Sequence, residues 1–248
     1  MADLPNRLLD IVYPRTCPGC ETSDWDPGPV RLCHHCSKQL TPLPSPFCDI
    51  CGEPFVEGSQ AGTTCRRCRD SRPEYDFARA PFLATDLLRE MIHSFKYGRQ
   101  MHLSPLLATL LEQSLGDRRF SLEETWLLVP VPLHPRRERE RHFNQSAELC
   151  SLLAQSRGFE RCNALRRIRY TSAQAHLERK ERLTNLVDAF ALSRLAWQQR
   201  AIQRANILLV DDVMTTGSTA NECAKVLKRV GSASKVAVIT VARASATT

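Results

Sequence analysis

Four pairs of cysteines, each with two residues between its members, lie between residues 17 and 68 and constrain the fold more than any other feature. Two cysteines on so tight a turn can reach the same metal ion, and a second turn completes a tetrahedral set of four thiolates, which suits Zn²⁺. The spacing therefore predicts two structural zinc ions. The expected ligands are Cys17, Cys20, Cys33, Cys36, Cys48, Cys51, Cys65 and Cys68.

Two ways of pairing these turns are open. In sequence order, the cysteines from Cys17 to Cys36 bind one ion and those from Cys48 to Cys68 bind the other, whereas a cross-braced arrangement joins the first turn with the third. We favour sequence order because both spacers are short and nearly equal. Each unit is too small to bury a sufficient core, so its folding should depend on the metal.

The role of this region has two interpretations. Zinc ribbons often serve only to fold, because the metal supplies the stability that a small core lacks. Alternatively, basic side chains around the last cysteine pair contact a nucleic-acid backbone. These side chains are Arg66, Arg67, Arg69 and Arg72.

The composition changes near residue 70, after which only Cys150, Cys162 and Cys223 occur, and we expect these to be packing residues. This change predicts a double zinc ribbon over residues 1–72 and a second domain over residues 73–248. Because there is no run of about 18 apolar residues and no signal-peptide pattern at the start, the expected location is the cytoplasm, where cysteines stay reduced. The net charge of +7 suits an anionic partner but is equally typical of a mildly basic soluble protein.

Apolar periodicity in the second domain predicts alternating helices and strands. Such an order is typical of an α/β fold with a parallel sheet flanked by helices. Helices are expected at residues 86–96, 105–115, 143–157 and 219–230, and buried strands at 126–132, 207–210 and 235–241.

The most informative segment runs from residue 210 to residue 219, directly after the strand predicted at 207–210. A short apolar strand delivers Asp211 and Asp212, whose carboxylates can accept hydrogen bonds from the vicinal hydroxyls of a ribose. A turn of hydroxyl residues and glycine then opens a helix, whose free backbone amides can bind phosphate. The simpler interpretation is a strand followed by a well-capped helix, and the pattern is not a Walker A loop, because the Gly-Lys-Ser/Thr ending is missing. The turn residues are Thr215, Thr216, Gly217, Ser218 and Thr219.

A basic turn follows the strand predicted at residues 126–132. The sequence V-P-V-P-L-H-P-R-R at residues 129–137 places Arg136 and Arg137 where they can bind a diphosphate. Arginine and glutamate alternate after this point, as they do on a solvated helix face. Both interpretations stand, and we favour diphosphate binding.

The segment from 210 to 219 resembles the phosphoribosyl diphosphate (PRPP) binding motif of type I phosphoribosyltransferases. The resemblance implies that Asp211 and Asp212 bind the ribose 2′- and 3′-hydroxyls, that residues 215–219 bind the 5′-phosphate, and that Mg²⁺ bridges diphosphate and ribose oxygens. It also implies a loop from residues 166–185 that closes over the substrate. Purine-salvage members carry an aspartate at the position of Thr215, which argues against hypoxanthine or guanine salvage.

Nearly the whole chain resembles the ComF/GntX family, which joins a double zinc ribbon to a type I phosphoribosyltransferase-like domain. The motifs occur in the family's order, although His142 stands where the family usually has glycine. They are the two ribbons, V-P-V-P-L-H-P-R-R, F-N-Q at 143–145, R-x-R-x-T-x-x-Q at 167–174, R-L-T-N-L-V-D-A-F at 182–190 and L-L-V-D-D-V-M-T-T-G-S-T at 208–219.

This resemblance implies a function in the uptake or utilisation of external DNA. The protein would act on incoming single-stranded DNA in the cytoplasm, with DNA-uptake proteins at the inner membrane as candidate partners and PRPP as a bound regulator or substrate. Two alternatives stay open: a true phosphoribosyltransferase that acts on an unidentified acceptor in nucleotide salvage or biosynthesis, and a PRPP-binding fold kept as a scaffold. Because no acceptor-specific residue is visible, the sequence favours PRPP binding over catalysis.

Overall fold

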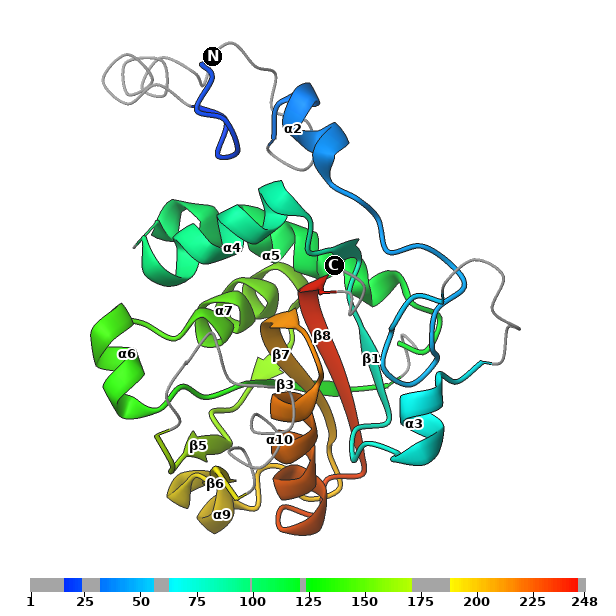
Figure 1. The fold of residues 1–248 in the computed structure, drawn as a ribbon. Helices are drawn as coiled ribbons and strands as arrows, with labels where there is room; N and C mark the ends of the chain where they lie inside the picture. Colours follow the sequence, from blue (N-terminus) through cyan, green and yellow to red (C-terminus); the bar gives the residue numbers. More distant parts are fainter. Residues whose placement is uncertain are drawn as a thin grey trace.

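A parallel β-sheet forms the centre of the computed structural model, which describes residues 16–23, 32–55, 63–98, 100–120, 124–170 and 188–244 (Figure 1). The strand order is β1-β8-β7-β3-β4, with β2 also paired to β8, and each of these pairings is parallel. The predicted α/β fold is confirmed. The strands are β1 Phe77–Arg79, β2 Phe82–Leu83, β3 Trp126–Pro130, β4 Glu160–Arg161, β7 Asn206–Met214 and β8 Lys235–Arg243.

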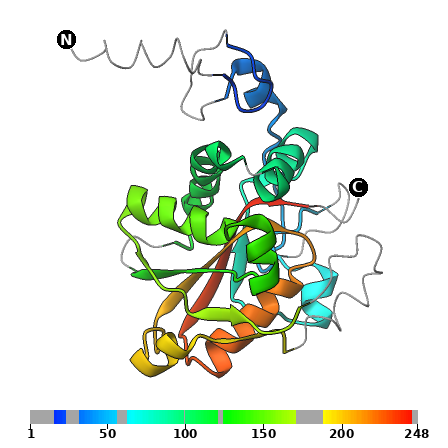
Figure 2. The same ribbon diagram turned by 90° about the vertical axis from the view of Figure 1, so that its left-hand side faces the viewer.

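Helices cover both faces of the sheet, as Figures 1 and 2 show. Helices α4, α5 and α7 pack on one face, and α10 packs on the other. A separate antiparallel pair, β5 and β6, lies beside α10. The bounds are α4 Asp86–Tyr97, α5 Ser104–Glu112, α6 Pro135–Arg141, α7 Gln145–Arg157, β5 Leu165–Arg167, β6 Phe190–Leu192, α9 Arg194–Gln199 and α10 Ser218–Arg229, with short 3₁₀ helices η1 Met101–Leu103 and η2 Gln113–Gly116.

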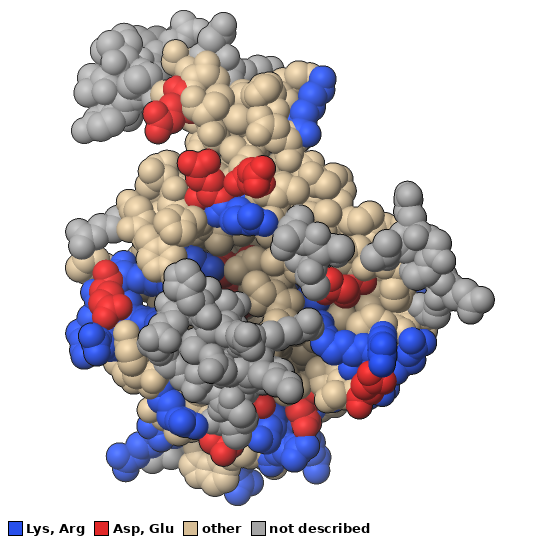
Figure 3. Space-filling view, in the orientation of Figure 1, with Lys and Arg blue, Asp and Glu red and all other residues tan. Residues whose placement is uncertain are grey.

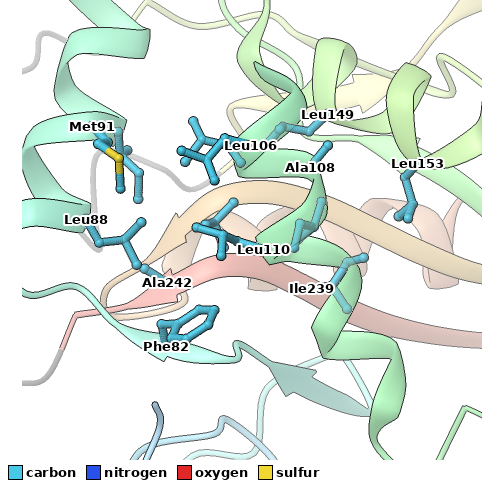
Figure 4. Close-up of a cluster of buried hydrophobic side chains, with 14 of the residues drawn as sticks. Phe82, Leu88, Met91, Leu106, Ala108, Leu110, Leu149, Leu153, Ile239 and Ala242 are labelled. Carbon is cyan, nitrogen blue, oxygen red and sulfur yellow. The ribbon is translucent and has the colours of Figure 1, made fainter. Parts of the chain in front are cut away.

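Alternation along the central strands produces the two buried layers. Leu208 and Val210 of β7 belong to the cluster under α4, α5 and α7, whereas Ile207 and Leu209 belong to the cluster under α10. This is the two-residue period of a strand with both faces covered. Figure 4 shows the first cluster, in which side chains of α4, α5 and α7 meet those of β8 and β2.

Strand β7 is longer than the predicted strand at 207–210. It continues to Met214, so Asp211 and Asp212 lie within the strand and not in the turn after it. Strand β3 stops pairing with β7 at Val210, but β8 continues the ladder as far as Met214. The extension is therefore a consequence of a neighbouring strand. The short elements β4, β5, β6, α6 and α9 were also not predicted.

The zinc-ribbon region packs directly onto this sheet. Its first helix, α2 (His34–Gln39), lies beyond α4 in both views, and its second helix, α3 (Arg66–Asp70), lies on the side of β1 (Figures 1 and 2). The Ala78 amide of β1 donates a hydrogen bond to the Ile50 carbonyl at 2.7 Å, so backbone hydrogen bonding crosses the predicted boundary after residue 72. In the described part of the chain, no helix is long and apolar enough to cross a membrane.

His142 ends α6 in the left-handed region, with φ 69° and ψ −6°. This conformation costs a residue with a Cβ about 1 kcal/mol, and glycine avoids that cost. We expect His142→Gly to raise the free energy of unfolding by about 0.5–1 kcal/mol, measured by urea denaturation. His142→Ala is the control, because it removes the imidazole but keeps the Cβ. An equal gain in both variants would contradict the backbone explanation.

Candidate functional site

The eight paired cysteines form two separate clusters, in sequence order. In each cluster the four sulfur atoms lie within 4.8 Å of one another. This confirms the pairing that we favoured over the cross-braced arrangement. The first centre is Cys17, Cys20, Cys33 and Cys36, and the second centre is Cys48, Cys51, Cys65 and Cys68.

The geometry of both centres fits zinc. The Sγ atoms of Cys20 and Cys33 are 3.7 Å apart, as are those of Cys51 and Cys65. This matches the edge of about 3.8 Å in a tetrahedron with Zn–S distances of about 2.3 Å. His34 and His35 are exposed, in keeping with complete four-cysteine sets.

Backbone amides support the sulfur atoms in the same way in both centres. The Cys33 amide donates to Cys17 Sγ and the Cys65 amide donates to Cys48 Sγ, each at 3.3 Å. Burial raises the pKa of the Cys17 thiol, but hydrogen bonds from the amides of Cys33 and Gly19 outweigh it and lower the pKa to about 7. Such donors stabilise the thiolate form that binds zinc.

The paired aspartates lie at the carboxyl end of β7, beside two other elements. Asp212 is buried, and its Oδ1 forms an ion pair with Lys96 Nζ of α4 at a distance of 2.7 Å. Oδ1 of the partly buried Asp211 accepts hydrogen bonds from Ser146 Oγ of α7 and from the Asp212 amide, each at 3.0 Å. Lys96 and Ser146 therefore belong to the site.

The loop after β7 has the features of a phosphate cradle. Gly217 caps α10 with φ 79°, and a Cβ at this position would lie 3.0 Å from Tyr75 Oη and 2.6 Å from Met214 Cε, so only glycine fits. Thr216 Oγ1 and Ser218 Oγ are hydrogen-bonded at 2.8 Å. The backbone amides of Thr215, Thr216, Gly217 and Thr219 donate no hydrogen bond to another described residue, as at any helix start, so they are available to an anion.

Arginines on α6, after β3, and on β5 make the neighbourhood of the aspartates basic. Helix α6 begins in the basic turn after β3, with the His134 side chain accepting from the Arg136 amide at 3.2 Å. Arg167, the last residue of β5, has its pKa lowered by burial and by the nearby charges of Arg137 and Arg141, while Asp211 acts in the opposite sense. The positive charges of Arg137 and Arg141 therefore lie near Arg167, and together they favour an anion in this region.

Comparison with known proteins identifies the relatives of this chain. A family model described as a double zinc ribbon domain matches residues 8–69. Competence protein F of Haemophilus influenzae is 32% identical over 203 residues, which cover 81% of this chain and 85% of that protein. This chain belongs to the ComF family. The DNA utilization protein YhgH of Salmonella typhimurium is 33% identical over 205 residues (82% and 86% covered), and the competence protein ComFC of Bacillus subtilis is 26% identical over 221 residues (86% and 84% covered).

Among solved structures, the allosteric regulatory enzyme of purine biosynthesis matches 56% of this ComF-family chain with 18% identity and a TM-score of 0.34. The ComF-family chain covers 25% of that structure's length.

The residues predicted to bind PRPP do not all lie together in this ComF-family protein. Asp211, Asp212 and the loop at 215–219 lie together at the end of β7. Arg137 lies near Arg167, but the exposed Arg136 forms an ion pair with Glu140 on α6 at 3.2 Å, as on a solvated helix face. Most of the closing loop predicted at 166–185, from residue 171 onward, lies outside the described residues. Lys96, Ser146 and Arg167 were not among the predicted binding residues. They come from α4, α7 and β5, and only the packing of these elements brings them near the aspartates.

Burial and the neighbouring charge of Asp212 raise the pKa of Asp211 to about 7, although Lys96 and two hydrogen bonds oppose the shift. An unfolded aspartate has a pKa of about 3.9, so this group's contribution to stability is complete below about pH 4 and is lost as the pH rises through 7. We expect Asp211→Asn to be more stable than the wild type by about 1–2 kcal/mol at pH 8, with a smaller difference at about pH 5.5. Urea denaturation at both pH values measures this, with the exposed Asp188→Asn as control. The same difference at both pH values would contradict the assignment.

Proposed function

We propose that this ComF-family protein binds PRPP at the carboxyl ends of β3 and β7 and handles incoming single-stranded DNA in the cytoplasm during DNA uptake or utilisation. The observation that carries the PRPP proposal is the position of two adjacent carboxylates beside a helix start whose amides are available to a ligand. Asp212 and Gly217 belong to one strand–loop–helix unit. A phosphorylated sugar carries hydroxyls that can bind the two carboxylates and a phosphate that can bind the amides of the helix start.

Each part of the site would take one part of PRPP. The amides and hydroxyls of residues 215–219 suit the 5′-phosphate, and the carboxylates of Asp211 and Asp212 suit the ribose hydroxyls. Arg137 of α6 and Arg167 of β5 suit the diphosphate, because guanidinium groups bind phosphate oxygens through paired hydrogen bonds. Mg²⁺ bound with PRPP would balance diphosphate charge, and the two carboxylates are oxygen donors of the kind that it prefers.

Calorimetric titration tests PRPP binding directly. PRPP with Mg²⁺ should bind more tightly than ribose 5-phosphate or diphosphate alone, because only PRPP contacts both sides of the site. Absence of binding by both PRPP and ribose 5-phosphate would overturn the proposal and favour the scaffold alternative. Release of diphosphate from PRPP with a panel of acceptors would favour a true phosphoribosyltransferase, as in nucleotide salvage or biosynthesis.

Exposed tyrosines paired with arginines support the DNA part of the proposal. Tyr97 is 55% exposed, and the Arg141 guanidinium lies 4.5 Å from its ring centre. Tyr170 is 41% exposed, with Arg136 at 4.8 Å. Bases can stack on such rings while arginines contact phosphates. Figure 3 shows basic side chains gathered at the edge where α6 lies and around α3.

Fluorescence anisotropy with a labelled oligonucleotide tests this surface. Tyr97→Ala combined with Tyr170→Ala should weaken single-stranded DNA binding by roughly tenfold or more, since stacking contributes about 1–3 kcal/mol per base. Neutralising the exposed Arg66 and Arg69 tests the alternative surface on α3. Arg67 is unsuitable for this test, because its partly buried side chain lies near Cys51 of the second centre. Binding that does not weaken at higher salt would contradict phosphate contacts.

A further inference from the structure

We infer that the second zinc centre is a structural support of the phosphate loop, so that loss of its metal disrupts phosphosugar binding while loss of the first centre does not. The inference rests on the proposed PRPP site. It assigns the two similar ribbons different roles, although their spacing in the sequence is nearly the same.

Tyr75 connects the second centre to the loop. Its side chain is almost completely buried, in the same cluster as Cys48, Cys51 and Cys68. Its hydroxyl oxygen lies 3.0 Å from the position that a Cβ would take on Gly217. The hydroxyl end of Tyr75 thus lies against the glycine of the loop, within the buried cluster that also holds the cysteines of the second centre.

The chain that leaves the second centre is also attached along α10. The Glu74 amide donates to Asn221 Oδ1 in the first turn of α10 at 2.8 Å. At the other end of the helix, Asp76 pairs with Lys228 at 2.8 Å and Glu74 pairs with Arg229. Since the start of α10 is one wall of the phosphate cradle, displacement of residues 74–76 would move that wall.

A third connection runs through the end of β8. Arg243 is completely buried and forms an ion pair with Glu53, two residues after Cys51. Arg243 is also the register partner of Met214, the last residue of β7 before the loop. Breaking a buried ion pair leaves an uncompensated charge, so Glu53 must stay in place if the strand ends are to keep their positions.

In the described part of the chain, the first centre makes no equivalent contacts with the loop at 215–219. Among the described residues, Cys17, Cys33 and Cys36 belong to the other buried cluster, together with Leu88 and Met91 of α4. That cluster does not include Tyr75 or Met214. The first ribbon therefore packs against α4 and not against the loop at 215–219, which makes it the control for the loop contacts.

Two double variants of the full-length protein test the inference. Cys48→Ser/Cys65→Ser removes the second centre, and Cys17→Ser/Cys33→Ser removes the equivalent ligands of the first. Each should lose one of the two zinc ions by metal analysis. PRPP affinity should fall roughly tenfold or more in the second-centre variant, because small displacements of binding groups have large effects, and should stay near the wild-type value in the other. Equal losses, or none in the second-centre variant, would overturn the inference.

Two further measurements keep the test independent of folding defects and of PRPP. Tyr75→Ala removes the connecting side chain but leaves all eight cysteines, so it should retain both zinc ions and still lose affinity. Hydrogen exchange of a peptide covering residues 214–222 should become faster in the second-centre variant only. If the wild type binds no PRPP, the proposed function fails, whereas the exchange measurement still decides whether the second centre supports the loop.

Discussion

Asp212→Asn is expected to reduce PRPP affinity by roughly 10- to 100-fold, because it replaces a charge-assisted hydrogen bond to a ribose hydroxyl by a neutral one in a buried site. The same change leaves the largely buried Lys96 ammonium without its partner at 2.7 Å. We therefore also expect a loss of stability of about 2–4 kcal/mol. Calorimetry with PRPP and Mg²⁺ measures the first effect, and urea denaturation measures the second.

A combined variant separates the two effects. Lys96→Met/Asp212→Asn removes the unpaired charge, so it should recover much of the stability of Asp212→Asn without recovering PRPP binding. Asp188→Asn is the charge-matched control, because its side chain is 80% exposed and lies outside the site. An Asp212→Asn protein that binds PRPP like the wild type would exclude this carboxylate as a ribose ligand.

Removal of zinc should produce the largest loss of stability in the molecule. Structural zinc bound by four thiolates contributes about 10–16 kcal/mol of apparent binding free energy at neutral pH. Because the buried Cys48 and Cys51 belong to the cluster that continues under α10, a strong chelator should lower the melting temperature of the whole chain. Metal analysis should give two zinc ions per chain before treatment, one for each cluster.

Cys162 offers the control for this experiment. It is partly buried and lies outside both clusters, so Cys162→Ser should keep both metal ions and change stability by less than about 1 kcal/mol. Unchanged thermal unfolding after complete removal of zinc would show that the ribbons are not needed for the fold. Fewer than two ions per chain in fully reduced protein would contradict one of the two centres.

The Lys96–Asp212 pair and the raised pKa of Asp211 have a common cause. Two adjacent carboxylates at a strand end are costly to bury, and the fold reduces the cost with one cation and with donors from Ser146 and the backbone. Groups held in this way are typical of functional sites, where stability is exchanged for binding. The expected gain in stability of Asp211→Asn at pH 8 has the same physical origin.

Local sequence determined those features of this protein whose causes lie within a few residues or a short spacer. The cysteine spacing specified both metal centres, since each turn brings its own two sulfur atoms together. Alternating apolar residues specified the central strands. Gly158 follows α7 and Gly217 precedes α10, and both adopt the positive φ that glycine tolerates best. The acid pair and the loop at 215–219 could be recognised in the sequence because they also form one short continuous segment.

Only the tertiary structure decided how these pieces combine. The extension of β7 through Asp211 and Asp212 depends on pairing with β8, and the partners of the two acids, Lys96 and Ser146, come from other helices. Contact between Tyr75 and Gly217 likewise joins a residue near the ribbons to the far end of the chain. Such contacts depend on how whole elements pack around a common core, and no local pattern of residues encodes that packing.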